Sequence, residues 1–147
     1  MRDISHRLDV TTAALYYHFE NKDDLLLAAV TPALDDLEAL LAKAPKSTST
    51  RRAFLASYTD LLIKHQAAIR LINRDPAVAS HPAIGPRIQT AEAEVAKHLS
   101  GRRGVRSRAL TVAAVGAVLM PILTLDRSEL TGLTDVLVQG AMAVLGG

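Results

Sequence analysis

The sequence predicts an all-α protein, and three observations support that fold class. Hydrophobic residues make up 49% of the 147 residues but aromatic residues only 3%, so Ala, Leu and Val must supply most of the core. Such a core is more typical of helices than of sheets, which are enriched in aromatic residues. Apolar residues also recur at intervals of three and four over most of the chain, which is the helical period. Finally, residues that favour helix starts precede several of these runs, among them Thr11 or Thr12, Asn21 and Pro86.

Composition and motifs exclude several classes of protein. The chain has no Cys, which rules out disulfides, thiolate metal sites and Cys nucleophiles, and its formal net charge is only +2. It contains no Ser-His-Asp elbow, phosphate-binding loop or dinucleotide fingerprint, so no enzyme and no cofactor are expected. His65, His81 and His98 lack the spacing of metal ligands, so no metal is expected either. The N-terminal residues do not resemble a signal peptide, which favours a cytoplasmic protein.

Two short helices are expected in the first twenty residues. One spans residues 2–8, with Ile4 and Leu8 as a buried pair four positions apart. The other begins at Thr11 or Thr12, whose hydroxyl would cap its first turn. Its outward side suits a DNA groove, because small side chains permit close approach and polar ones carry donors for phosphates and base edges. These outward residues are Thr11, Thr12, Ala13, Tyr16, Tyr17 and His18.

A long helix is expected next. Asn21 is suited to cap it, and Asp23 and Asp24 in its first turn would complement the positive end of the helix. Pro32 lies inside the apolar repeat, so we expect a continuous but bent helix that reaches about Lys43. Such a helix would connect the two N-terminal helices to the rest of the protein.

The rest of the chain is expected to form helices separated by polar or Pro-containing segments. Asp75-Pro76 should end one helix, because the residue before Pro leaves the helical region. Residues 77–86 are expected to form a loop or short turn, and the Arg-rich residues 102–108 a solvated loop. After a polar linker over residues 44–50, the expected helices are Arg51–His65, a helix from Gln66 or Ala67 to Arg74, Pro86–Leu99, the apolar run 109–125, and Glu129–Leu145.

The apolar run over residues 109–125 has three possible interpretations. A membrane span is disfavoured, because its 17 residues fall short of about 20 and no interfacial Trp or Tyr flanks it. A helix that is apolar all round is more often buried inside protein. The burial is either wholly internal or shared with a second copy, and small residues that permit close helix approach favour a homodimer through the last two helices. The residues expected at that interface are Ala113, Gly116, Ala117, Leu133, Leu137, Gly140 and Val144.

One N-terminal segment carries side chains and spacings that suggest a family. An Ile-bearing helix and a turn before Val10 precede the pattern Leu15-Tyr16-x-His18-Phe19-x-Asn21-Lys22-x-x-Leu25. This segment resembles the helix-turn-helix of the tetracycline-repressor-like (TetR) family of transcriptional regulators. Asp9 stands where the family usually has Gly, and Asp tolerates the left-handed conformation of that turn.

The resemblance implies a helix-turn-helix region over residues 1–24 and a helical effector-binding and dimerisation domain over residues 25–147. Because the sequence starts on or beside the second helix of that motif, the first helix of the DNA-binding domain is expected to be missing from it. The resemblance implies phosphate contacts by Tyr16, His18 and Lys22. It also implies contacts with base edges or the groove wall by Thr12, Ala13 and Tyr17, with Thr11 mainly in the cap.

The expected function is that of a ligand-responsive transcriptional regulator. Its partners would be double-stranded operator DNA, a second copy and a small, largely apolar effector, whose binding would release a repressor from DNA. The alternative is a helical dimeric small-molecule-binding or interaction module without DNA-binding activity. Candidate effector-binding residues are Phe54, Tyr58, Leu62, Ile69, Ile72, Asn73, Ile88, Met120 and Leu123, with Tyr58 and Asn73 as the orienting polar groups.

Overall fold

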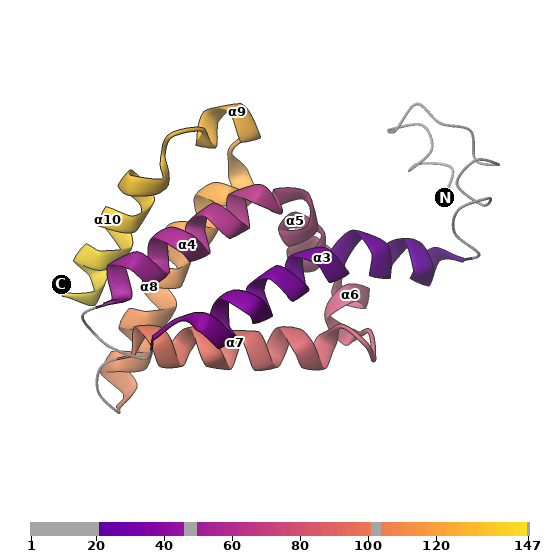
Figure 1. Cartoon of the computed structure of the whole chain (residues 1–147), viewed down its shortest axis with the longest axis horizontal. Helices are drawn as coiled ribbons and strands as arrows, with labels where there is room; N and C mark the ends of the chain where they lie inside the picture. Colours follow the sequence, from indigo (N-terminus) through magenta and orange to yellow (C-terminus); the bar gives the residue numbers. More distant parts are fainter. Residues whose placement is uncertain (1–20, 46–49, 101–103, 147) are drawn as a thin grey trace.

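The computed structural model of the protein describes residues 21–45, 50–100 and 104–146, and every element in those ranges is a helix. The expected all-α fold is therefore confirmed. In Figure 1, α3 lies along the other helices and its N-terminal turns extend beyond them. The helices are α3 (Lys22–Lys43), α4 (Arg51–Lys64), α5 (Gln66–Arg74), α6 (Pro76–Ser80), α7 (Gly85–Leu99), α8 (Val105–Thr124), α9 (Arg127–Leu130) and α10 (Thr134–Leu145).

The long helix predicted from Asn21 to about Lys43 is present as α3. The Asn21 Oδ1 atom accepts a hydrogen bond of 2.8 Å from the backbone N–H of Asp24, which satisfies one of the unpaired donors of the first turn. Pro32 lies within the helix without ending it. The helix is therefore one continuous connection between the N-terminal segment and the body.

Two clusters of buried side chains hold the body together. The larger one lies among α4, α7, α8 and α10 and includes Leu55, Val118 and Val138, each almost fully buried. The smaller one joins the middle of α3 to α6 and the start of α7 through Val30, Leu34, Val78 and Ile84. Burial of such side chains is the main stabilising term of the fold, so the smaller cluster fixes the middle of α3 to the body. Residues 22–29 of α3 contribute none of the fully buried positions.

Three predicted boundaries were wrong. A short helix, α6, occupies the first half of the expected loop, because Asp75 caps Ala77 at 3.0 Å and Pro76 suits a first helical position. In addition, α8 begins at Val105, so the end of the Arg-rich segment is helical rather than loop.

The third wrong boundary is the start of the last helix. Asp126 and Glu129 form a capping box that starts the separate short helix α9. Gly132 then has φ 78°, a left-handed conformation that breaks the helix. As a result α10 begins at Thr134 rather than at Glu129.

By length and composition, α8 alone among the described helices is long and apolar enough to cross a membrane. The core helix of a soluble protein passes the same test. Here α8 packs against α4, α5, α7 and α10, and its residues Thr111, Ala114, Val118 and Ile122 are buried.

Candidate functional site

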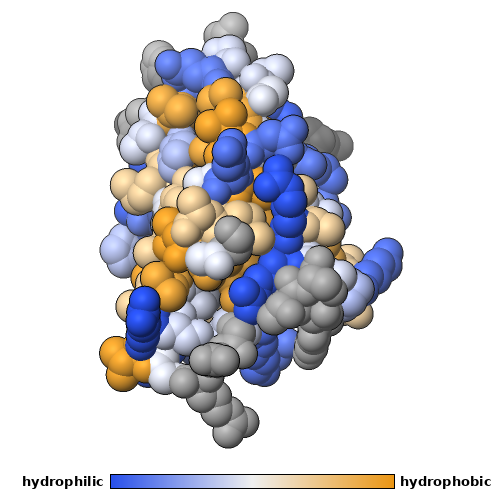
Figure 2. All heavy atoms as spheres, turned by 90° about the vertical axis from the view of Figure 1, so that its left-hand side faces the viewer, coloured by the Kyte–Doolittle hydropathy of each residue, from blue (hydrophilic) through white to orange (hydrophobic). Residues whose placement is uncertain are grey.

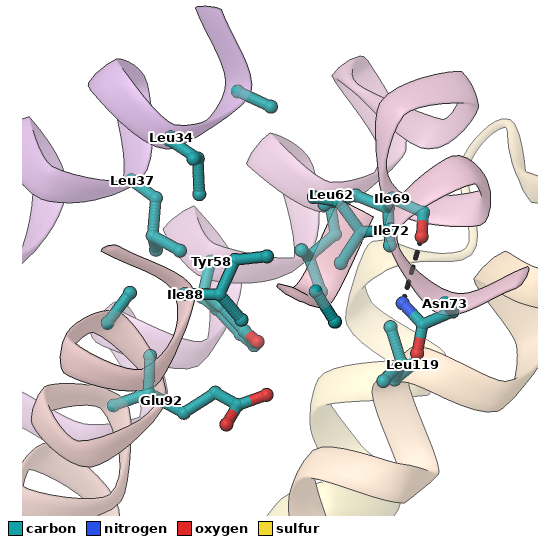
Figure 3. Close-up of a pocket in the computed structure, with 14 residues that line it drawn as sticks. Leu34, Leu37, Tyr58, Leu62, Ile69, Ile72, Asn73, Ile88, Glu92 and Leu119 are labelled. Atoms are coloured by element: carbon teal, nitrogen blue, oxygen red, sulfur yellow. Dashed lines mark hydrogen bonds between the residues drawn. The ribbon is translucent and has the colours of Figure 1, made fainter. Parts of the chain in front are cut away.

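A cavity of about 340 Å³ lies beneath α3, with walls from α3, α4, α5, α6, α7 and α8. Figure 3 shows side chains from these helices converging on it. Its volume falls in the range of small-molecule sites, about 300–1,000 Å³. Six of the nine effector-binding candidates line it: Tyr58, Leu62, Ile69, Ile72, Asn73 and Ile88.

The other three candidates lie elsewhere. Phe54 is buried in the main core, where its ring stacks on Tyr58 at 5.9 Å and on His98 at 4.6 Å between centroids. Met120 points outward from α8 and is 56% exposed. Leu123 packs against the main core instead of the cavity. Helical period alone assigned these residues to the protein interior, but it did not distinguish the core from the cavity.

Residues that the sequence reasoning missed complete the cavity. Ala33, Leu34 and Leu37 line it from α3, and Leu119 lines it from α8. Glu92 lines it from α7, one turn beyond Ile88. The four-residue spacing of Ile88 and Glu92 was a usable signal, because residues four apart share a helix face. An acidic residue on an amphipathic helix is normally assigned to solvent, which is why this signal was overlooked.

The polar groups of the cavity are few. The Asn73 Nδ2 atom donates a hydrogen bond of 2.8 Å to the Ile69 carbonyl oxygen, which fixes the amide in the wall (Figure 3). Burial, with a smaller contribution from the charge of Glu92, raises the pKa of Tyr58 to about 12, so its hydroxyl stays protonated at neutral pH.

Ion pairs hold the outer side of α3 at the level of the cavity. Arg87 of α7 contacts Asp35 at 2.6 Å and Glu38 at 2.7 Å. Asp36 accepts hydrogen bonds of 2.7 Å from both Lys64 and His65, at the junction of α4 and α5. These acidic residues alternate along α3 with the cavity residues 33, 34 and 37, so one stretch of α3 both lines the cavity and is fixed to its walls.

The predicted DNA contacts lie almost entirely outside the described residues. Thr11, Thr12, Ala13, Tyr16, Tyr17 and His18 belong to that N-terminal part, and only Lys22 can be placed. Lys22 is the first residue of α3 and is exposed.

A comparison with protein-family models identifies this N-terminal part. Residues 1–29 match the model of bacterial regulatory proteins of the tetR family. The N-terminal segment is therefore of the TetR family. Members of this family are DNA-binding transcriptional regulators, so the coarse function expected from the residues is supported by an independent match. No curated protein matches the chain.

The TetR-family segment runs directly into the body. Its match ends at residue 29, which is the eighth residue of the helix α3 that starts at Lys22. The expected boundary between residues 24 and 25 therefore falls inside a continuous helix, and four residues after the match Ala33 lines the cavity. The first residues of α3 therefore belong to the TetR-family segment, and its middle residues line the cavity.

An apolar surface stripe runs along the outward sides of α8 and α10. On α8 the exposed residues Val105, Val112 and Met120 are 84%, 71% and 56% exposed, and on α10 Val136 is 60% exposed. Figure 2 views the molecule from this side and shows hydrophobic residues gathered in a band between hydrophilic ones. Exposed apolar side chains gathered on one side in this way are typical of interaction surfaces.

The predicted interface residues divide between this stripe and the interior. In the single chain Ala113 and Gly140 are exposed and Gly116 is half-buried. Residues that a second copy is to cover should be accessible in this way. Leu137 is buried within the chain, and Ala117, Leu133 and Val144 pack against its own core. The outward side of α10 is instead formed by Val136, Gly140 and Ala143, because α10 turns its Leu-bearing side toward α4 and α8.

Proposed function

We propose that the protein is a ligand-responsive DNA-binding transcriptional regulator, a cytoplasmic repressor that a small, largely apolar effector releases from its operator. One observation carries the proposal: the single helix α3 begins within the TetR-family segment and lines the cavity with Ala33, Leu34 and Leu37. An effector in the cavity therefore contacts the helix that carries the DNA-binding segment.

The regulation follows from two positions of α3 relative to the body. The ion pairs of Arg87 and of Lys64 with the acidic residues of α3 stabilise one of these two positions. An effector shifts the equilibrium only by the difference between its affinities for the two conformations. An effector that fits the cavity best when α3 is displaced would turn the two DNA-binding segments of a dimer out of register with the DNA.

The DNA contacts are proposed from the residue pattern. Tyr16, His18 and Lys22 would bind phosphates, and Thr12, Ala13 and Tyr17 would contact base edges or the groove wall, while Thr11 mainly caps its helix. The exposed position of Lys22 at the start of α3 supports this assignment, because an exposed ammonium group can bind a phosphate.

A homodimer through the outward side of α8 and α10 completes the proposal. Gly116 and Gly140 lie inside these helices, and a Cβ atom built on either would have no neighbour within 4 Å. Glycine inside a helix costs about 1 kcal/mol relative to Ala, and the described part of the chain offers no packing reason for it. Close approach of a second copy supplies that reason. A two-fold dimer would place its recognition helices about one DNA turn, or a small multiple of it, apart.

The test is DNA binding measured by fluorescence anisotropy with the DNA upstream of the gene. The chain and a version extended upstream in the reading frame are both titrated at several salt concentrations. We expect specific binding whose affinity falls steeply with salt, because phosphate contacts release counterions. Tyr17→Ala should weaken discrimination between the operator and a scrambled DNA, whereas Lys22→Gln should weaken both complexes and reduce the salt dependence. If neither version binds DNA specifically, the proposal fails and the binding-module alternative takes its place.

A further inference from the structure

The cavity has an uneven charge. Most of the residues that line it are apolar, and the polar ones are Tyr58, Asn73 and Glu92. Glu92 is the charged side chain among them, and no Lys, Arg or His from the described residues lines the cavity. A ligand inside it therefore meets one negative charge and no positive one.

Glu92 is an exposed residue, so its carboxylate is accessible both to solvent and to a ligand. Figure 3 shows its carboxylate extending from α7 toward the same part of the cavity as the Tyr58 hydroxyl. No ion pair or hydrogen bond joins Glu92 to another residue in the part of the chain that the structure describes. Lys97, one turn further along α7, pairs with Glu94 at 2.5 Å instead. Glu92 also borders an outer groove that carries Lys97 and Arg108, and neither of these cations contacts its carboxylate.

The two other polar side chains do not offset this charge. Asn73 donates one of its two Nδ2–H groups to the Ile69 carbonyl, which leaves the second N–H and the oxygen, directed toward Leu119 in Figure 3. The Tyr58 hydroxyl is neutral, because burial and the nearby Glu92 raise the pKa of Tyr58 to about 12. The cavity thus offers one carboxylate, a neutral amide and a neutral phenol, and no cationic side chain from the described residues.

We propose that the effector is a compact apolar molecule with one protonated amine, whose ammonium group binds the Glu92 carboxylate while its body packs on Leu37, Leu62 and Ile72. This inference rests on the proposed effector role of the cavity. A volume of about 340 Å³ is at the lower end of small-molecule sites, which favours a molecule of one or two fused rings. An anionic effector would be repelled by the Glu92 carboxylate, so the same residue also selects against acids.

Three probes with the same ring system and similar size test the proposal: naphthylmethylamine, naphthylmethanol and naphthoic acid, in the same positional isomer. Their binding to the full chain is measured by isothermal titration calorimetry at neutral pH. We expect the amine to bind about threefold to fivefold more tightly than the alcohol, as for a charge pair at an exposed carboxylate, and the acid to bind most weakly. A molecule held only by apolar contacts would show no such order.

Variants assign the preference to one side chain. Glu92→Gln should abolish the advantage of the amine and leave the affinity of the alcohol within about twofold. Glu92→Asp keeps the charge and should keep the order of the three probes. Asp135→Asn is the matched control, since it removes the same charge from the exposed start of α10 and should leave the order unchanged.

The outcomes separate this inference from the function on which it rests. Equal binding of amine and alcohol, or an amine preference that survives in Glu92→Gln, would overturn the cationic effector but keep the cavity as the effector site. Failure of all three probes to bind would overturn the effector role of the cavity together with this inference. DNA binding is measured separately and does not depend on either result.

Discussion

Arg87 on α7 binds Glu38 on α3 through two parallel hydrogen bonds, Nε to Oε1 at 2.7 Å and Nη2 to Oε2 at 2.9 Å. This bidentate geometry is the strongest arrangement for a guanidinium and a carboxylate. The two residues are 49 positions apart in the sequence, and their contact fixes α3 to α7 beside the cavity.

Arg87→Met should lower the free energy of unfolding by about 1 kcal/mol, the upper end for a partly exposed pair. The effect should shrink in about 1 M salt, where charges are screened within about 3 Å. Urea unfolding at low and high salt measures it. Arg74→Met is the control, because Arg74 is exposed at the end of α5 and forms no ion pair with a described residue. Equal losses in the two variants would refute the role of the Arg87 pair.

The acidic residues of α3 should also set the acid sensitivity of the protein. Hydrogen bonds from Arg87 lower the pKa of Glu38 below its ordinary 4.5, and those from Lys64 and then His65 lower the pKa of Asp36 below its ordinary 3.8. A carboxyl with a lowered pKa in the folded chain stabilises it above the unfolded pKa, and this contribution is lost as the pH falls through the folded pKa.

The contribution of Glu38 to the stability of the fold should therefore decrease as the pH falls below about 4.5. The contribution of Asp36 should decrease as the pH falls below about 3.8. The double variant Asp36→Asn with Glu38→Gln should have a flatter dependence of unfolding free energy on pH in that window. Urea unfolding at a series of pH values measures both slopes. A double variant as steep as the parent would show that other groups dominate acid unfolding.

His98 should stabilise the end of α3 through both its ring and its nitrogens. It is 4% exposed, its Nδ1 and Nε2 atoms lie 2.9 and 3.2 Å from the carbonyl oxygens of Glu94 and Ala44, and its ring stacks on Phe54. His98→Ala removes ring and hydrogen bonds and should cost about 3 kcal/mol, as for other buried rings. His98→Phe keeps the stacking and should cost about 1–2 kcal/mol for the unpaired carbonyl. If His98→Phe proves at least as destabilising in urea unfolding, stacking is not the larger contribution.

Gly85 is required where α6 meets α7. A Cβ atom at this position would lie 2.4 Å from the carbonyl oxygen of Ala79, so the backbone itself must move to accept one. Gly85→Ala should therefore cost about 1–3 kcal/mol, the range for overpacking. Ala79 and Ile88 line the cavity on either side of this corner, so affinity for the amine probe should fall as well. Thermal unfolding and calorimetry test the two effects, and an unchanged melting temperature would contradict the first.

Substitution of Gly116 by Ala should have the opposite effect on the stability of the monomer. Nothing lies within 4 Å of a Cβ built there, so Gly116→Ala should stabilise the monomer by about 1 kcal/mol through helix propensity. The same change should weaken the proposed dimer, because close helix approach needs the absent side chain. Light scattering over a range of protein concentrations, with unfolding of the dilute monomer, separates the two. Tighter association of Gly116→Ala would argue against α8 contacts at this position.

The local residue pattern was enough to predict the helices and part of the cavity lining. Asn21 with Asp23 and Asp24 marked the start of α3, and the residue patterns of α4, α5 and α7 predicted six cavity residues before any contact was known. These features depend on neighbours within one or two turns, so they can be read along the chain. The residue pattern of the TetR-family segment is local in the same sense.

The sequence by itself determined that the chain is helical, where most of its helices begin and end, and which family its N-terminal segment resembles. Only the tertiary structure decided that Leu137 faces inward and Val136 outward, that Arg87 reaches Glu38, and that Glu92 borders the cavity. The physical reason is that periodicity groups residues on one side of a helix without stating what that side meets. The partner of a helix face is set by the packing of several helices at once, and those helices are far apart in the chain.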